Sequence, residues 1–338
     1  MVYLDLILNH LEVEPLYTED LYINPVAARE NCDILILPFS NMLSPSFFAA
    51  ELIDILDQYD FSIVLLSIGI QAEEFEEVDS IEISADALRL LRLSINKGFV
   101  VGARGEDTSF LLSRYEIPHE VIGCPSALID FKQRLVPPVF GDGDIFAVNT
   151  TLSGHNQQRC KDIVELFVKY PSIYFMQSES RIIADVFKIN LTDVYPNGDA
   201  PGGESNYLNH IDYDYGFYCG LGVDKYSVQK AFRSRSFFDL DIDRWRSRIR
   251  CCSFSIGSRF HGNILACHEG IPSLFVRFDR RTNELIDYHN LPNVDCLSDN
   301  IFDVVRRIDY TDYYRGLPGK REVFNKFLNR NSIPSVVF

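Results

Sequence analysis

The sequence lacks the motifs that mark several large enzyme classes. It has no Gly-x-x-x-x-Gly-Lys loop, no Gly-x-Gly-x-x-Gly, no His-Glu-x-x-His, no paired Cys-x-x-Cys and no Gly-x-Ser-x-Gly. These absences argue against a P-loop nucleotidase, a dinucleotide-dependent dehydrogenase, a zinc enzyme and an α/β-hydrolase. The eight cysteines are scattered without metal-ligand spacing. We interpret them as thiols of a cytoplasmic protein that binds no metal.

Basic residues are also in short supply. Lys and Arg total 32 against 48 Asp and Glu, so the net charge is −16. This balance argues against a general nucleic-acid binder and against a polybasic membrane anchor. No apolar stretch is long enough for a membrane-spanning helix, which leaves only peripheral membrane contact open. An anion would need a local arginine cluster, and this requirement draws attention to Arg104, Arg259 and Arg281.

What the chain does contain is an alternation of apolar strands and amphipathic helices. With 338 residues, 46% of them hydrophobic, it is long enough for two domains. Continuous apolar strands between amphipathic helices predict α/β architecture with parallel sheets covered on both faces. The Pro- and Gly-rich segment 137–144 is the expected boundary between an N-terminal domain, 1–138, and a C-terminal domain, 139–338.

The individual elements follow from the same periodicity. The expected strands are 33–37, 62–67, 98–102, 120–122, 145–149, 172–176, 254–256 and 274–276. The expected helices are 45–58, 85–96, 106–115, 155–169, 181–187, 242–250, 299–307 and 313–328.

The segment 251–282 carries the strongest functional signal. After its first strand, Gly257 permits a turn, Ser258 suits a helix N-cap, and Arg259 and His261 fall in the first helical turn. The backbone N–H groups and dipole of a helix N-terminus favour an anion. The segment therefore predicts a site for a phosphate or carboxylate.

More basic side chains follow the next strand. Arg280 and Arg281 come after residues 274–276, at the carboxyl end where open α/β sheets bind ligands. Arg259 and Arg281 suit fork contacts to a carboxylate or phosphate. The alternative for Arg259 is an ion pair with a nearby acid, and the sequence alone does not decide between Arg280 and Arg281 for the second contact. Arg104 also follows a strand and could either clamp phosphate or pair with Asp107.

His261 is the expected acid or base because histidine titrates near neutrality; the alternative is a hydrogen-bonded core histidine. His268, farther along the same expected helix, is interpreted as structural.

Three blocks resemble the polysaccharide pyruvyl transferase family: Ser258-Arg-Phe-His-Gly262, Gly270-Ile-Pro272 and Asp279-Arg-Arg-Thr-Asn-Glu-Leu285. Weaker similarities are Ser67-Ile-Gly-Ile-Gln71 and the segment from Val101 to Ser109. The resemblance implies two Rossmann-like domains facing a cleft, similar to GT-B glycosyltransferases. It also implies transfer of the enolpyruvyl group of phosphoenolpyruvate to two hydroxyls of a sugar or lipid-linked oligosaccharide, which closes a pyruvate ketal.

The resemblance further implies roles for particular residues. His261 would be catalytic, and the substrate-binding residues would be Ser258, Arg259, Gly262, Arg281, Glu284 and Arg104. Phosphoenolpyruvate would lie on the C-terminal domain as a co-substrate, the acceptor would enter from the N-terminal domain, and no metal or bound cofactor is implied.

Two other functions stay open. A nucleotide-sugar glycosyltransferase on the same fold would bind a nucleotide instead of phosphoenolpyruvate. A non-catalytic sugar-binding relative is favoured by the lack of a glycine after the expected first strand, 3–8. His261 and Arg281 argue against that relative, because binding alone would not need the histidine.

Overall fold

The structure is a computed structural model that describes residues 16, 18–139, 141, 143–150, 157–177, 180–188, 224–297 and 301–338. The expected strand at 3–8 lies outside these residues. The chain divides into two compact units. Unit 1 contains residues 131–277 and 292–309, and unit 2 contains residues 2–130, 278–291 and 310–338.

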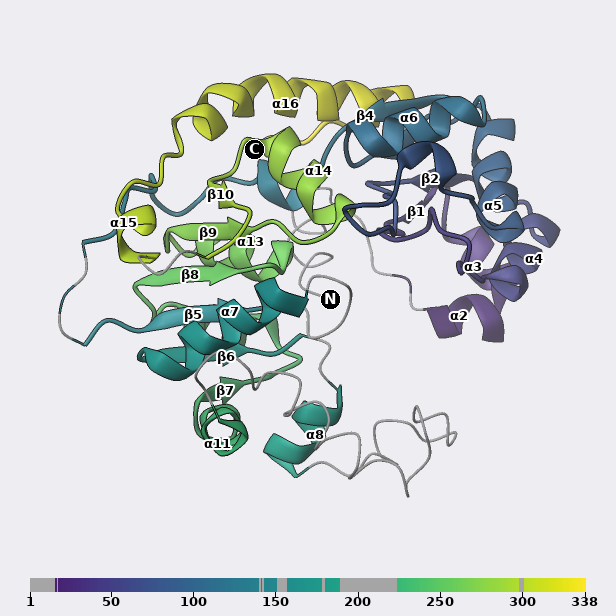
Figure 1. The fold of residues 1–338 in the computed structure, drawn as a ribbon. Coiled ribbons are helices and arrows are strands. Elements are labelled where there is room, and N and C mark those ends of the chain that lie inside the picture. The colour runs from purple at the N-terminus through teal and green to yellow at the C-terminus, as the bar shows by residue number, and fades with distance from the viewer. Residues whose placement is uncertain are drawn as a thin grey trace. The chain divides into compact units, whose positions relative to one another are not determined.

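Unit 1 is built on a six-stranded parallel sheet with the order β10-β9-β8-β5-β6-β7, which can be followed in Figure 1. Its strands are β5 (Phe146–Asn149), β6 (Ser172–Phe175), β7 (Ser236–Phe237), β8 (Phe254–Gly257), β9 (Ser273–Val276) and β10 (Asn293–Val294). Counted in chain order within the unit, this is the doubly wound order 3-2-1-4-5-6 of Rossmann folds. The order reverses between β5 and β8, the adjacent first and fourth strands.

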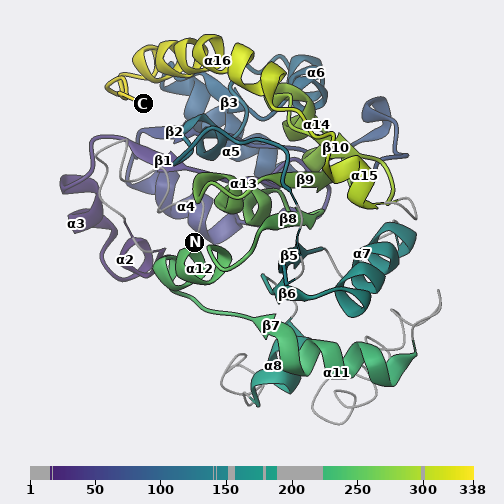
Figure 2. The same cartoon turned by 90° about the vertical axis from the view of Figure 1, so that its left-hand side faces the viewer.

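Helices cover both faces of this sheet. Figure 2 shows α12 and α13 on one side and α7 on the other. The helices of unit 1 are α7 (Gln157–Lys169), α8 (Ser180–Phe187), α11 (Lys225–Arg235), α12 (Ile242–Ile249), α13 (Phe260–His268) and α15 (Ile301–Val305). The residues of β5, β6, β8 and β9 are all buried, as expected for a parallel sheet packed on both faces.

The described residues of unit 2 form four short parallel strands. β1 (Leu35–Leu37) pairs with β2 (Ile63–Leu65), and β3 (Val101–Ala103) pairs with β4 (His119–Val121). A parallel bridge between Ile68 and Ala103 joins the two pairs.

The helices around these strands are α2 (Thr18–Ile23), α3 (Pro25–Glu30), α4 (Ala50–Gln58), α5 (Ala85–Asn96), α6 (Glu106–Arg114), α14 (Arg280–His289) and α16 (Thr311–Arg330), with 3-10 turns η1 (Val78–Ser80) and η2 (Pro125–Leu128). In α5, Ser84 caps the N-terminus by accepting from the Ala87 amide, and Leu90 and Leu91 lie on the buried face.

The predicted α/β class with parallel sheets is confirmed. The compact units differ in their limits from the ranges 1–138 and 139–338. The segment 131–139 belongs to unit 1, whereas 278–291 and 310–338, which carry α14 and α16, belong to unit 2. Contacts within unit 2 explain this grouping: Tyr313 donates to the Ala127 carbonyl at 2.9 Å, and the Asn331 amide bonds the Val100 backbone.

Candidate functional site

The residues around His261 lie where the strand order of unit 1 reverses. β5 and β8 run side by side, with Asn149 in register with Gly257 at their carboxyl ends. Thr150 directly follows β5, and Ser258 and Arg259 directly follow β8 and lead into α13. In doubly wound sheets this switch point is where the ligand crevice forms.

Asn149 organises the backbone at this point. Its carboxamide accepts a hydrogen bond from the Arg259 amide at 3.0 Å and donates to the Asn263 side chain at 2.9 Å. Its main-chain oxygen accepts from the Ser258 amide at 3.1 Å. Asn263 in turn accepts from the Ser255 hydroxyl and donates to the Gly257 carbonyl, both at 2.8 Å. Each of these side-chain groups is buried, so the bonds fix the entry to α13 rigidly.

Two glycines allow this close packing. A Cβ on Gly257 would lie 1.8 Å from the Asn149 main-chain oxygen. A Cβ on Gly262 would lie 2.6 Å from the Gln177 amide nitrogen. Gly257 was expected to permit a turn, but it belongs to β8 and its role is close approach between neighbouring strands. The missing side chain of Gly262 therefore leaves room for the Gln177 and Asn149 side chains beside the first turn of α13.

The expected N-cap at Ser258 is wrong. The helix begins at Phe260, and Arg259 takes the cap position without a side-chain cap bond. The Ser258 hydroxyl instead lies 2.9 Å from the Thr150 hydroxyl, and the Arg259 Nε donates to the Thr150 carbonyl at 3.1 Å. Both residues therefore join the end of β8 to the end of β5.

The two histidines of α13 differ in their surroundings. His261 is partly exposed near the start of the helix, and its ring meets that of Phe260 edge to face at 5.4 Å. His268 is buried at the other end, and its ring lies 5.5 Å from that of Phe131. The structural interpretation of His268 is consistent with this packing, while His261 keeps partial exposure at the switch point.

Unit 2 holds the other three predicted site residues. Arg104 follows β3, is 2% exposed, and its Nε donates to the Ser67 carbonyl at 2.9 Å. Glu284 on α14 accepts from the Thr108 hydroxyl at 2.7 Å and from the Thr108 amide at 3.1 Å. Burial raises the pKa of Glu284 to about 7, although the bonds from Thr108 and the Arg104 charge oppose the rise.

The structure distinguishes Arg280 from Arg281. Arg280 forms an ion pair with Asp107 at 2.8 Å and its Nε donates to the Glu76 carbonyl at 2.5 Å. Arg281 donates to the Asn41 side chain at 2.9 Å and pairs with Asp279 at 3.1 Å, with its own side chain 25% exposed. Asp279 also caps α14 through the Thr282 amide at 2.7 Å. The expected alternative of an Arg104–Asp107 salt bridge is not formed, because Asp107 pairs with Arg280.

The seven candidates thus fall into two groups. Ser258, Arg259, His261 and Gly262 belong to unit 1, and Arg104, Arg281 and Glu284 belong to unit 2. Sequence reasoning missed Asn149, Asn263 and Thr108, whose bonds hold these groups. A polar residue directly after the apolar run 145–148 was the available signal for Asn149.

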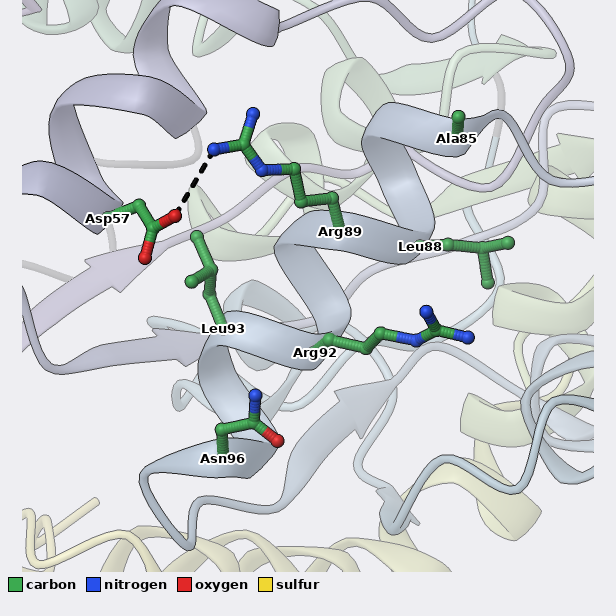
Figure 3. Close-up of a pocket in the computed structure, with 7 residues that line it drawn as sticks. All are labelled: Asp57, Ala85, Leu88, Arg89, Arg92, Leu93 and Asn96. Atoms are coloured by element: carbon green, nitrogen blue, oxygen red, sulfur yellow. Dashed lines mark hydrogen bonds and ion pairs between the residues drawn. The ribbon is translucent and has the colours of Figure 1, made fainter.

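One hollow lies elsewhere in unit 2. About 400 Å³ of space lies along α5, beside Asp57, Arg89 and Arg92 (Figure 3). Arg89 is held there by Asp54 and Asp57, at 2.5 and 3.2 Å. No predicted site residue lines it. Over the described residues, no group of three or more His, Cys, Asp or Glu side chains is arranged to hold a metal, and no helix there has the length and apolar character to cross a membrane.

These features define an α/β protein whose glycines, histidine and arginine gather at the carboxyl ends of parallel strands, the usual ligand-binding edge of this architecture. The chain belongs to the polysaccharide pyruvyl transferase family, whose model matches residues 8–280. It is therefore assigned to the transferases. Arg281 and Glu284 lie just beyond the matched residues.

Three solved structures are distantly similar to the chain. The Staphylococcus aureus MnaA–UDP co-structure is 12% identical, with a TM-score of 0.44 over 98% of this chain and 81% of that chain. A putative UDP-N-acetylglucosamine 2-epimerase from Listeria monocytogenes is 14% identical, with a TM-score of 0.39 over 98% and 82%. The glycosyltransferase SnogD from Streptomyces nogalater is 8% identical, with a TM-score of 0.26 over 89% and 96%. No curated protein sequence matches the chain. At these scores the likenesses do not support an argument about function.

Proposed function

We propose that this protein transfers the enolpyruvyl group of phosphoenolpyruvate to a sugar of a polysaccharide or of its precursor and closes a pyruvate ketal. One observation carries the proposal: an Arg-x-His pair enters α13 at the switch point of a doubly wound sheet, in a chain of the pyruvyl transferase family. The switch point supports the proposed position of the site, and membership of the family supports the class of reaction.

The proposed chemistry needs a proton and an anion site. C3 of the enol gains a proton while a sugar hydroxyl bonds to C2, and the C–O bond to phosphate breaks. A second hydroxyl then bonds to C2 to close the ketal. Of the two hydroxyl protons, one balances the proton gained by C3 and the other leaves with inorganic phosphate. General acid–base assistance of this kind contributes about 10²–10⁴ in rate.

The residues divide these tasks as follows. His261 would relay the proton, because it is partly exposed at the helix start. Arg259 and Arg281 would bind the carboxylate and phosphate, and the amide-rich entry to α13 would add the favourable end of the helix dipole. Arg104 would contribute positive charge from a buried position. Ser258 and Gly262 would form the wall beside the anion.

The acceptor in this proposal is a sugar or a lipid-linked oligosaccharide on the side of unit 2. The enzyme would work in the cytoplasm, would need neither metal nor bound cofactor, and would contact membrane only at its surface. The net charge of −16 disfavours nucleic acid as a partner.

The test is release of inorganic phosphate from phosphoenolpyruvate that depends on an added sugar acceptor. We expect release with the wild type. In His261→Gln we expect turnover lower by about 10²–10⁴ with phosphoenolpyruvate affinity nearly kept, because Gln hydrogen-bonds but does not titrate near pH 7. Wild-type turnover in His261→Gln on the accepted sugar would remove the acid–base role. No acceptor-dependent release across a broad set of sugars would overturn the proposed reaction.

A further inference from the structure

Glu284 is placed as a connector inside unit 2. Glu284 belongs to α14 and is 6% exposed. Its carboxyl accepts hydrogen bonds from both the hydroxyl and the backbone amide of Thr108, in the first turn of α6. The Thr108 hydroxyl also accepts from the Ile70 amide at 3.3 Å, in the segment after β2. A carboxylate so enclosed has little surface left for a sugar hydroxyl. The role of Glu284 therefore follows from the groups that contact its carboxyl.

The surroundings are shaped for Arg104 and Glu284 together. A Cβ on Gly69 would lie 2.7 Å from Arg104 Cδ and 3.4 Å from Glu284 Oε1. A Cβ on Gly105 would lie 2.7 Å from Glu284 Cβ and 2.9 Å from Oε2. Both glycines therefore make room for an arginine and a carboxylate side by side, and the Ser67 carbonyl holds the arginine in place.

The charges facing Glu284 come from three elements. Arg104, at the end of β3, stabilises its ionised form, as do the two bonds from Thr108 on α6. Asp107 on α6 opposes ionisation, but it is itself paired with Arg280 of α14. Burial is the largest effect and raises the pKa of Glu284 to about 7, so this carboxyl changes charge in the neutral range.

We propose that Glu284 is a positioning residue and a proton-controlled counter-charge for Arg104, which sets how much of the arginine's positive charge acts on a bound anion. The inference rests on the proposed function in that the anion is phosphoenolpyruvate. When Glu284 is ionised, the pair is close to neutral. When it is protonated, Arg104 acts with its full charge, so anion affinity rises.

The size of the effect follows from Coulomb's law. At the effective dielectric constant of about 20 found in proteins, one unit charge roughly 10–20 Å from a singly charged anion changes the affinity for that anion by roughly four- to sixteen-fold. Screening by salt reduces the change. The predicted effect is therefore measurable, and its sign is opposite to the loss expected if Glu284 contacts the ligand.

The experiment measures binding of phosphoenolpyruvate and of inorganic phosphate to the full chain from pH 6 to 9 by calorimetry. Glu284→Gln removes the charge and keeps the shape. Glu106→Gln removes a charge from the exposed start of α6, the helix that carries Thr108, and is the control. The measured quantity is the ratio of variant affinity to wild-type affinity at each pH. The ligand's own ionisation affects the variant and the wild type equally, so it cancels in this ratio.

We expect Glu284→Gln to bind three-fold or more tightly than the wild type at pH 8 and within two-fold of it at pH 6. Glu106→Gln should follow the wild type at both. In Thr108→Val, which keeps the carboxyl but loses a donor to it, the pH at which affinity falls should move upward. Thr108→Val tests the inference even if Glu284→Gln does not fold. If affinity fell at the same pH in Thr108→Val as in the wild type, the inference would be contradicted.

Weaker binding by Glu284→Gln at every pH, or a ratio that does not vary with pH, would overturn the counter-charge role. The melting temperature gives a readout without ligand: the wild type should lose stability relative to Glu284→Gln as the pH rises from 5 to 8. If the melting temperatures follow this course but no protein binds phosphoenolpyruvate, the proposed function fails and the titration of Glu284 stands. If the difference in melting temperature between wild type and Glu284→Gln did not change with pH while phosphoenolpyruvate still bound, the inference would be wrong and the proposed function would be unaffected.

Discussion

The two units hold their candidate residues by different physical means. In unit 1, neutral amides and hydroxyls around Asn149 fix the start of α13. In unit 2, a buried arginine and a buried carboxyl lie side by side. The overall charge differs as well: of the chain's net charge of −16, Lys and Arg against Asp and Glu give −1 for unit 1 and −15 for unit 2.

This difference separates geometry from electrostatics. Neutral hydrogen bonds hold a backbone in place at any pH, whereas a buried carboxyl near its pKa makes its surroundings respond to pH. We therefore expect substitutions that disturb packing to destabilise unit 1 most, and changes of charge to have their largest effect in unit 2.

The largest expected effect is a packing change in unit 1. Gly257→Ala places a Cβ 1.8 Å from the Asn149 main-chain oxygen, so the strands must separate. We expect a loss of about 3 kcal/mol or more, at the upper end for overpacked cores, measured by denaturant unfolding. Gly319→Ala is the control: nothing lies within 4 Å of its Cβ inside α16, and it should be neutral or stabilising by about 0.5–1 kcal/mol. Equal unfolding curves for Gly257→Ala and wild type would disprove the account of this strand pair.

A charge effect in unit 2 comes next. The pKa of Glu284 in the folded chain is about 7, above its usual 4.5, so the fold favours the protonated form. The stabilising contribution of that form is full below pH 4.5 and is lost as the pH rises through 7. At about 1.36 kcal/mol per pKa unit, the wild type should lose on the order of 2–3 kcal/mol relative to Glu284→Gln between pH 5 and pH 8. A gap that stays level, as measured by urea unfolding at several pH values, would show that Glu284 does not titrate there.

The smallest effect concerns the two arginines at the start of α14. Arg281→Ala should weaken phosphoenolpyruvate binding by about 2 kcal/mol, the low end for a truncated charged contact, because the side chain is 25% exposed. Arg280→Ala should mainly lower stability, because its partners are Asp107 and the Glu76 carbonyl. Calorimetric titration of both variants tests the assignment, and the reverse order of affinities would transfer the ligand contact to Arg280.

Much of the fold was predictable because buried parallel strands leave long apolar runs. The helix expected at 85–96 is α5 with the same limits, and the strand expected at 145–149 begins one residue later, at Phe146. The helix expected at 45–58 begins only at Ala50, with Ala49 at its N-cap position. Helix α11, with its polar composition, gave no such signal and was missed.

The sequence predicted which residue types belong to the candidate site better than it predicted the side chains that hold them in place. The Arg-x-His pair and the Gly after it are local features, so the sequence could indicate them. Asn149 is 114 residues from its partner Asn263, and Glu284 is 176 residues from Thr108. Such pairings depend on which strands become neighbours and on which unit α14 joins, and neither is encoded locally.

The most direct test of the central claim is a thermal-shift comparison of ligands on the full chain. We expect phosphoenolpyruvate to raise the melting temperature in a salt-sensitive way, with a smaller rise in Arg281→Ala and no comparable rise from UDP-sugars. Saturation at a hundred times the dissociation constant would correspond to about 2.7 kcal/mol of stabilisation. Stabilisation by a UDP-sugar with no response to phosphoenolpyruvate would contradict the account and would favour a nucleotide-sugar transferase.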